Sequence, residues 1–177
     1  MPGGFAMIDR RAAIRLAIRF LVAVLPAAWL ALSPAQAQDF QKFVPFLVDL
    51  PGWTGAKADG MAMQMPGMNM ITATREYKRG NSKLSAGVIS GSTAQGMLAA
   101  VQAGVKIETA ELHINTTTVD GFTVARTFQV KEKSGAVLVM LGQSALFNLG
   151  FTDVPEDEAF ALAKRFDWKA IQAALPK

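Results

Sequence analysis

Alternating apolar and polar residues dominate the chain between residues 61 and 151, and this period of two is typical of half-buried β-strands. The alternating stretches are separated by dipeptides that favour tight turns, Pro66-Gly67, Gly80-Asn81 and Asp120-Gly121. The stretch at 136–143 is instead continuously apolar, which indicates a central strand buried on both faces. Strands joined by such short turns run antiparallel, so this pattern predicts one antiparallel sheet.

Apolar residues spaced three and four apart predict helices at the two ends of the domain and once within it. Residues 39–50 have this spacing and stop at Pro51-Gly52, and Ser92-Thr93-Ala94-Gln95 matches a capping box that opens a second helix. Pro155 with three following acids predicts a third helix, and Asp167 can cap a last turn. We therefore expect an α+β fold with an antiparallel sheet of about five or six strands and helices packed on one face.

Residues 1–37 have the three parts of a secretory signal peptide. Four arginines precede an apolar stretch at 20–32, and Ala35-Gln36-Ala37 fits the small-residue cleavage site. The apolar stretch is about 13 residues long and contains Pro26, whereas a membrane span needs roughly 20 residues. We expect cleavage before Gln38, no stable membrane anchor afterwards, and a single periplasmic domain at 38–177.

Charge and composition change their meaning once the signal peptide is set aside. Without Arg10, Arg11, Arg15 and Arg19 the chain keeps 14 of its 18 basic residues, and without Asp9 it keeps 13 of its 14 acidic ones. The net charge thus falls from +4 to about +1, which argues against a nucleic-acid partner. The absence of cysteine excludes disulfides, thiol catalysis and cysteine-ligated metals.

Short aromatic and glycine motifs recur at the start, middle and end of the predicted domain. They are Gly52-Trp53, Arg75-Glu76-Tyr77 with Gly80, and Phe166-Asp167-Trp168 with Leu175. In these residues the chain resembles a loose group of small exported proteins of Gram-negative bacteria with a PsbP-like α+β shape. The resemblance supports the architecture and implies no function.

Five of the nine methionines fall within ten residues, Met61, Met63, Met65, Met68 and Met70. If Pro66-Gly67 forms a two-residue turn, Met65 pairs with Met68 and Met63 with Met70. Alternation then places all five side chains on one face, the polar side that continues through Thr72 and Thr74. A bulge or a longer loop would distribute them over both faces.

Three interpretations of this methionine cluster stay open. Methionine is flexible and fills irregular gaps, so the cluster could pack at the edge of the core or form an adaptable apolar contact surface. Several thioethers that converge on one point would instead form a soft, neutral site for Cu(I) or Ag(I). The run is similar to the methionine-rich runs of periplasmic copper-handling proteins, a resemblance that implies Cu(I) as the bound metal.

His113 is the single histidine, and it could add an imidazole to a mixed metal site if its strand lay beside the methionine hairpin. Its alternate neighbours Thr109, Glu111 and Asn115 predict a polar, exposed face without a role. No nucleophile elbow, phosphate-binding loop or carboxylate pair accompanies it, so we expect no enzymatic activity.

Two functions from different classes follow. The first is an exported periplasmic protein that binds or buffers Cu(I) through the methionines. The second is an envelope interaction or assembly protein that contacts a partner protein or lipid, without metal, through the methionines and Trp53, Phe147 and Phe151.

Overall fold

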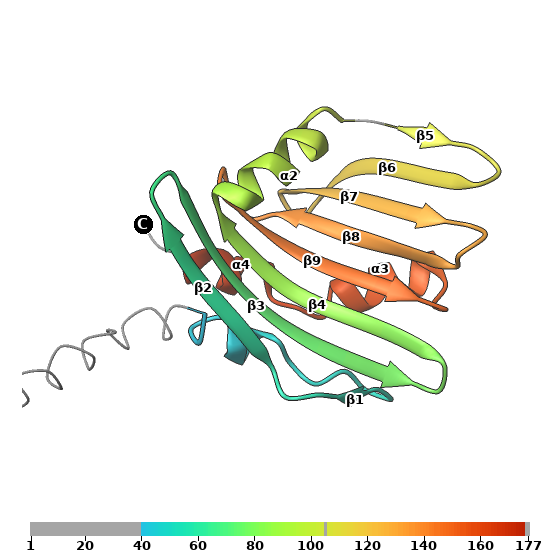
Figure 1. The fold of residues 1–177 in the computed structure, drawn as a ribbon. Coiled ribbons are helices and arrows are strands. Elements are labelled where there is room, and N and C mark those ends of the chain that lie inside the picture. Colours follow the sequence, from blue (N-terminus) through green and yellow to red (C-terminus); the bar gives the residue numbers. More distant parts are fainter. Residues whose placement is uncertain (1–39, 105, 176–177) are drawn as a thin grey trace, which may run out of the picture. The chain divides into compact units, whose positions relative to one another are not determined.

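The computed structural model describes residues 40–104 and 106–175, and these residues build one nine-stranded antiparallel sheet (Figure 1). The predicted signal peptide at 1–37 lies outside the described residues. The strands are β1 (Thr54–Gly55), β2 (Asp59–Met65), β3 (Met68–Arg79), β4 (Ser82–Gly91), β5 (Ile107–Glu108), β6 (Leu112–Val119), β7 (Phe122–Gln129), β8 (Ser134–Met140) and β9 (Ala145–Thr152).

The strand order across the sheet is β1-β3-β4-β9-β8-β7-β6-β5, and β2 also pairs with β3. The hairpins β3–β4 and β6–β7 turn at Gly80-Asn81 and Asp120-Gly121, as expected. Asp120 and Gly121 both have positive φ, 51° and 86°, which matches the twist of adjoining strands in a two-residue hairpin. The antiparallel sheet is thus confirmed.

The number of strands and the balance of the fold differ from expectation. Nine strands replace the expected five or six, and the described part of the chain is mainly β. Its helices are the 11-residue α2 (Ser92–Gln102), the 8-residue α3 (Glu156–Ala163) and the 6-residue α4 (Trp168–Ala173). Strands β1 and β5 have only two residues each, too few to produce a detectable alternation.

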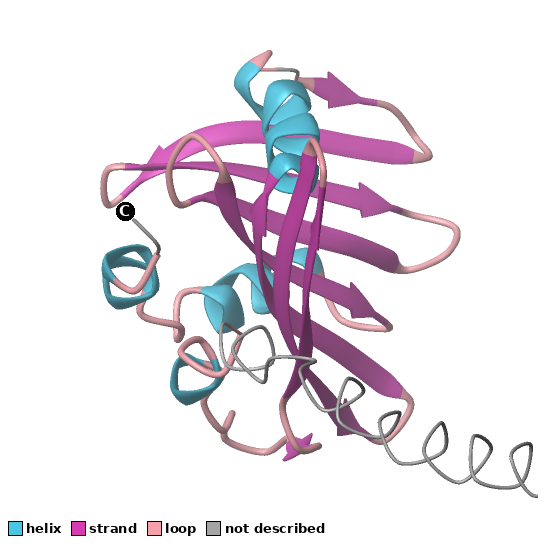
Figure 2. Cartoon of the chain, turned by 60° about the vertical axis from the view of Figure 1, so that its left-hand side comes forward, coloured by secondary structure: helices cyan, strands magenta, loops and turns pink. Residues whose placement is uncertain are grey.

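Helices cover both faces of the sheet rather than one. The inner face, which carries Tyr77, Val137 and Phe147, packs against α3, α4 and the 3₁₀ turn η2 (Val44–Phe46) in one large core. The outer face carries Leu138 and Leu146, which pack in a smaller cluster with α2. In Figure 1 helix α2 lies in front of the sheet and α3 and α4 lie behind it, and Figure 2 shows the same separation from another side.

The amino-terminal segment is not the expected helix. Pro45 lies inside it, and because proline lacks an N–H and clashes with the preceding turn, only the three-residue turn η2 forms. The spacing of its apolar residues still predicts which side chains face the core, since Phe43, Leu47 and Leu50 are all buried. Among the described residues, no helix has the length and apolarity to cross a membrane.

Two residues of β3 fasten this segment to the sheet. Arg75 donates to the backbone oxygens of Leu47 at 2.7 Å and Ala56 at 2.8 Å, and it pairs with Asp49. The hydroxyl of Tyr77 donates to the Val48 oxygen at 2.7 Å. The Arg75-Glu76-Tyr77 motif therefore has a structural role.

Candidate metal-binding site

The methionines lie on the hairpin formed by β2 and β3, whose connection is the two-residue turn Pro66-Gly67. Met65 lies opposite Met68 and Met63 lies opposite Met70, which confirms the predicted register. Gly67 has a φ of 78°, a conformation that favours glycine. Because residues directly opposite share a face and successive residues alternate, all five methionines occupy one face of the hairpin.

This methionine face belongs to the outer face of the sheet, since Ala73 and Tyr77 on the alternate positions of β3 are fully buried on the inner face. Four of the five side chains are exposed: Met61 by 51%, Met63 by 39%, Met65 by 55% and Met68 by 47%. Met70 is half-buried. Packing at the core edge is therefore the wrong interpretation for four of the five methionines.

The register defines how closely the thioethers can approach one another. Opposite Cβ atoms lie roughly 5 Å apart and next-but-one residues along a strand roughly 7 Å apart. Met63, Met65, Met68 and Met70 thus occupy the corners of a small rectangle, and each has a flexible side chain that can swing its Sδ atom over the centre. Met61 lies outside this rectangle, opposite Thr72.

The tip of the hairpin is tied to the start of α2 by three hydrogen bonds. The Asn69 amide donates to Ser92 Oγ at 3.1 Å, Ser92 Oγ donates to the Asn69 oxygen at 3.0 Å, and the Ser92 amide donates to Asn69 Oδ1 at 2.9 Å. These bonds hold the strand that carries Met68 and Met70.

The same contacts overturn the predicted capping box. The N-cap of α2 is Gly91, with a φ of 102° and no side-chain cap, and Ser92 is already helical. Space also demands glycine there, because a Cβ on Gly91 would lie 2.2 Å from the Asn69 oxygen. Sequence reasoning therefore missed Asn69 and Ser92 as residues that position the site.

His113 does not join the methionines. It lies on β6, and strands β4, β9, β8 and β7 separate β6 from β3, a distance of roughly 24 Å at the usual strand spacing. It also lies on the inner face, with Nδ1 3.9 Å from Glu156 Oε2 of α3 and its ring 6.2 Å from that of Phe128. The side chain of His113 is 40% exposed and has a charged neighbour, as expected, but the mixed imidazole site is wrong.

Glu156 instead belongs to an ionic cluster between β7 and α3. Arg126 Nε lies 3.7 Å from Glu156 and its guanidinium 3.6 Å from Asp157, and it stacks over the Phe160 ring at 4.9 Å. Glu156 and Asp157 of the first turn of α3 thus act on Arg126 as well as on the helix dipole, and Glu158 pairs with Arg79.

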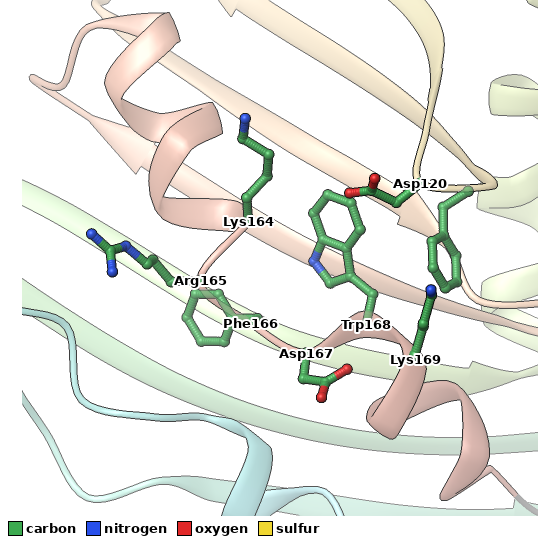
Figure 3. A pocket seen from close by; sticks show the side chains of 8 residues that line it. Asp120, Lys164, Arg165, Phe166, Asp167, Trp168 and Lys169 are labelled. Atoms are coloured by element: carbon green, nitrogen blue, oxygen red, sulfur yellow. The ribbon is translucent and has the colours of Figure 1, made fainter.

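A pocket of about 340 Å³ lies where α3, α4 and the Asp120 turn meet (Figure 3). Lys164 and Lys169 stand on either side of the Trp168 ring, and Asp167 is occupied in capping α4 through the Ala170 amide at 2.9 Å. No hydroxyl, thiol or imidazole is among the side chains that line this pocket.

Comparison with known proteins found no matching family model, no matching curated protein and no matching solved structure. Within residues 40–104 and 106–175, no group of three or more histidine, cysteine, aspartate or glutamate side chains could hold a metal ion. In the described part of the chain, the side chains that cluster and could bind a soft metal ion are therefore the thioethers of the hairpin methionines.

Proposed function

We propose that this protein is an exported, periplasmic Cu(I)-binding protein that buffers the metal through its methionine hairpin. The observation that carries the proposal is that five methionines share one face of the hairpin and that four of them are exposed and without a role in the core. Export is proposed on the signal-peptide pattern of residues 1–37.

The chemistry of the hairpin suits a soft monovalent cation. Thioethers are neutral and soft, and they need no deprotonation to bind Cu(I) or Ag(I). Asp59 is the one charged side chain between residues 59 and 74, so no lysine or arginine lies in the part of β3 that pairs with β2. Because no ligand carries a proton, metal affinity should not change between about pH 5 and pH 8.

The rectangle of Met63, Met65, Met68 and Met70 supplies the proposed ligands. Three sulfurs are enough for a trigonal site, and any three corners can reach a common centre. Met61 should contribute least because it lies one step farther from the turn.

A Cu(I) titration against a competing chelator, under anaerobic conditions, tests the proposal. We expect binding tighter than about 1 μM, which corresponds to roughly −8 kcal/mol. A triple variant with Met63, Met65 and Met68 changed to leucine should lose at least about a hundredfold in affinity. The matched control changes the half-buried Met97 and Met140 to leucine and should bind normally. Micromolar or weaker binding by the natural chain, or equal binding by the triple variant, would refute the proposal.

Exposure of the methionines also supports the second function, a metal-free contact surface for an envelope protein. The aromatic part of that hypothesis is wrong, because Trp53, Phe147 and Phe151 are 8%, 0% and 4% exposed and belong to the inner core. The methionines alone would form the surface. Metal analysis of protein purified from copper-supplemented cells separates the two functions, since a contact surface predicts no stoichiometric copper.

A further inference from the structure

Six of the seven methionines of the described chain fall into two classes by their surroundings, and the half-buried Met70 of the hairpin belongs to neither. Met61, Met63, Met65 and Met68 project into solvent from the hairpin. Met97 and Met140 are half-buried and pack in the outer cluster with Leu98 and Leu146. Both classes lie on the outer face of the sheet, so the difference between them is the solvent exposure of their side chains.

Access to the sulfur decides how a thioether reacts with an oxidant. A peroxide must approach the sulfur lone pair directly, so exposed methionines are oxidised before packed ones. The product, methionine sulfoxide, is polar and is returned to methionine by methionine sulfoxide reductases, which likewise need access.

We propose that the methionine hairpin is a reversible oxidation site for peroxide-class oxidants. A thioether sulfur attacks one oxygen of hydrogen peroxide, the S–O bond forms and the O–O bond breaks. The sulfur loses two electrons, the peroxide gains them, and the second oxygen leaves as water after taking up the proton of the first. Each oxidation thus consumes one peroxide per methionine and yields one sulfoxide and one water. In the return step a reductase removes the oxygen as a second water, with two electrons and two protons from a dithiol that becomes a disulfide.

The fold should tolerate this modification better at the hairpin than at Met97 and Met140. An oxygen added to Met61, Met65 or Met68 lies in water, where it can be hydrogen-bonded. An oxygen added to the half-buried Met97 or Met140 would be placed partly against the apolar side chains of Leu98 and Leu146. Oxidation at the hairpin should therefore be reversible without unfolding, whereas oxidation of Met97 or Met140 should weaken the packing of α2 on the sheet.

Oxidation should also regulate metal binding, and this step rests on the proposed function. A sulfoxide presents a hard oxygen in place of the soft sulfur that Cu(I) prefers. Conversion of two corners of the methionine rectangle leaves two sulfurs within it, one fewer than a trigonal site needs, so the oxidised hairpin should release Cu(I).

The order of oxidation can be measured on the metal-free full-length protein, with a chelator present, by hydrogen peroxide titration and tryptic mass spectrometry. Trypsin separates the classes, because cleavage after Lys57 and Arg75 yields one peptide with all five hairpin methionines. Met97 and Met140 fall in separate peptides, 84–106 and 134–164. We expect the hairpin peptide to react at least roughly fivefold faster than either control peptide. Within it, Met61, Met65 and Met68 should precede Met63, and Met70 should come last.

Equal rates for the hairpin and for Met97 or Met140 would overturn the proposal. Loss of the cooperative thermal transition once four sulfoxides have formed at the hairpin would also overturn it, as would failure of a methionine sulfoxide reductase to restore the unmodified peptide mass. A second measurement titrates Ag(I) into oxidised and then reduced protein and should show loss and recovery of binding. Because the oxidation order is measured without metal, absence of Ag(I) binding in both states would refute the proposed function and leave the oxidation site standing.

Discussion

Replacement of Tyr77 by phenylalanine should remove a specific loss of stability at high pH. Tyr77 is fully buried, its hydroxyl donates to the Val48 oxygen at 2.7 Å, and its ring meets that of Phe166 edge-on at 6.4 Å. Burial raises the pKa of Tyr77 from 10.0 to about 12, although the Arg75 guanidinium opposes the shift. Ionisation is thus disfavoured in the native state relative to the unfolded state.

The sign and size of the effect follow from proton linkage. Below pH 10 both states keep the phenolic proton, so Tyr77 adds no pH dependence. Between pH 10 and pH 12 the unfolded state loses that proton first, and the free energy of unfolding falls as pH rises. The full loss is about 2.7 kcal/mol for a shift of two pKa units, and about 1.4 kcal/mol of it is reached at pH 11.

Urea denaturation of both proteins at pH 8 and pH 11 measures this effect. At pH 8 the Tyr77→Phe variant should be about 1 kcal/mol less stable because it lacks the hydroxyl bond. At pH 11 this difference should vanish or reverse, since lysine titration affects both proteins equally. Tyr77 is the chain's single tyrosine, so the ultraviolet absorbance of tyrosinate reports its ionisation directly. A native-state titration midpoint near pH 10, or an equally steep pH dependence in the variant, would refute the reasoning.

Substitutions at four further positions test the packing around the hairpin and the sheet by urea denaturation. The Ser92→Ala variant lacks two of the three hydrogen bonds to Asn69, so its free energy of unfolding should fall by about 1 kcal/mol and amide hydrogen exchange at the hairpin tip should be faster. Unchanged exchange there would contradict the anchoring role. The Arg75→Met variant lacks the donors that hold the amino-terminal segment, so its free energy of unfolding should fall by about 2–4 kcal/mol. The Arg75→Lys variant should recover only part of this loss, and full recovery would argue against the bonding geometry. The Gly135→Ala variant should lose about 2 kcal/mol or more of its free energy of unfolding, because the new Cβ would lie 2.2 Å from a backbone oxygen of β7. The Gly96→Ala variant adds a Cβ in open space within α2 and should gain about 0.5–1 kcal/mol. Equal effects at the two positions would contradict the steric argument.

The candidate site was predictable from sequence to the extent that its geometry is local. The turn at Pro66-Gly67 and the alternation of the methionines lie within ten residues, so period two alone predicts both the pairing and the shared face. The exposure of the methionines was harder to predict from the sequence, because whether Met65 packs against other residues or points into solvent depends on which strand lies at the edge of the sheet.

The errors arise where distant residues override local preference. Ser92 has a local partner in Gln95 but bonds Asn69, which lies 23 residues earlier in the chain. His113 has polar alternate neighbours, yet the return of α3 beneath β6 and β7 makes its face an inner one. Pro45 is the exception, since the sequence alone contained the reason why no helix forms there.

The place of β9 in the sheet has a consequence for the order of folding. Among the described strands, none of β1 to β4 pairs with any of β5 to β8, and β9 joins the two groups by pairing with both β4 and β8. Lys83 and Ser134 both have Thr152 as their partner. A chain that emerges from its amino terminus can thus form the methionine hairpin early but cannot complete the inner core until residues 145–152 are available. These late, long-range pairings predict slow and cooperative folding. They also leave the inner core of the nascent chain incomplete for most of its synthesis.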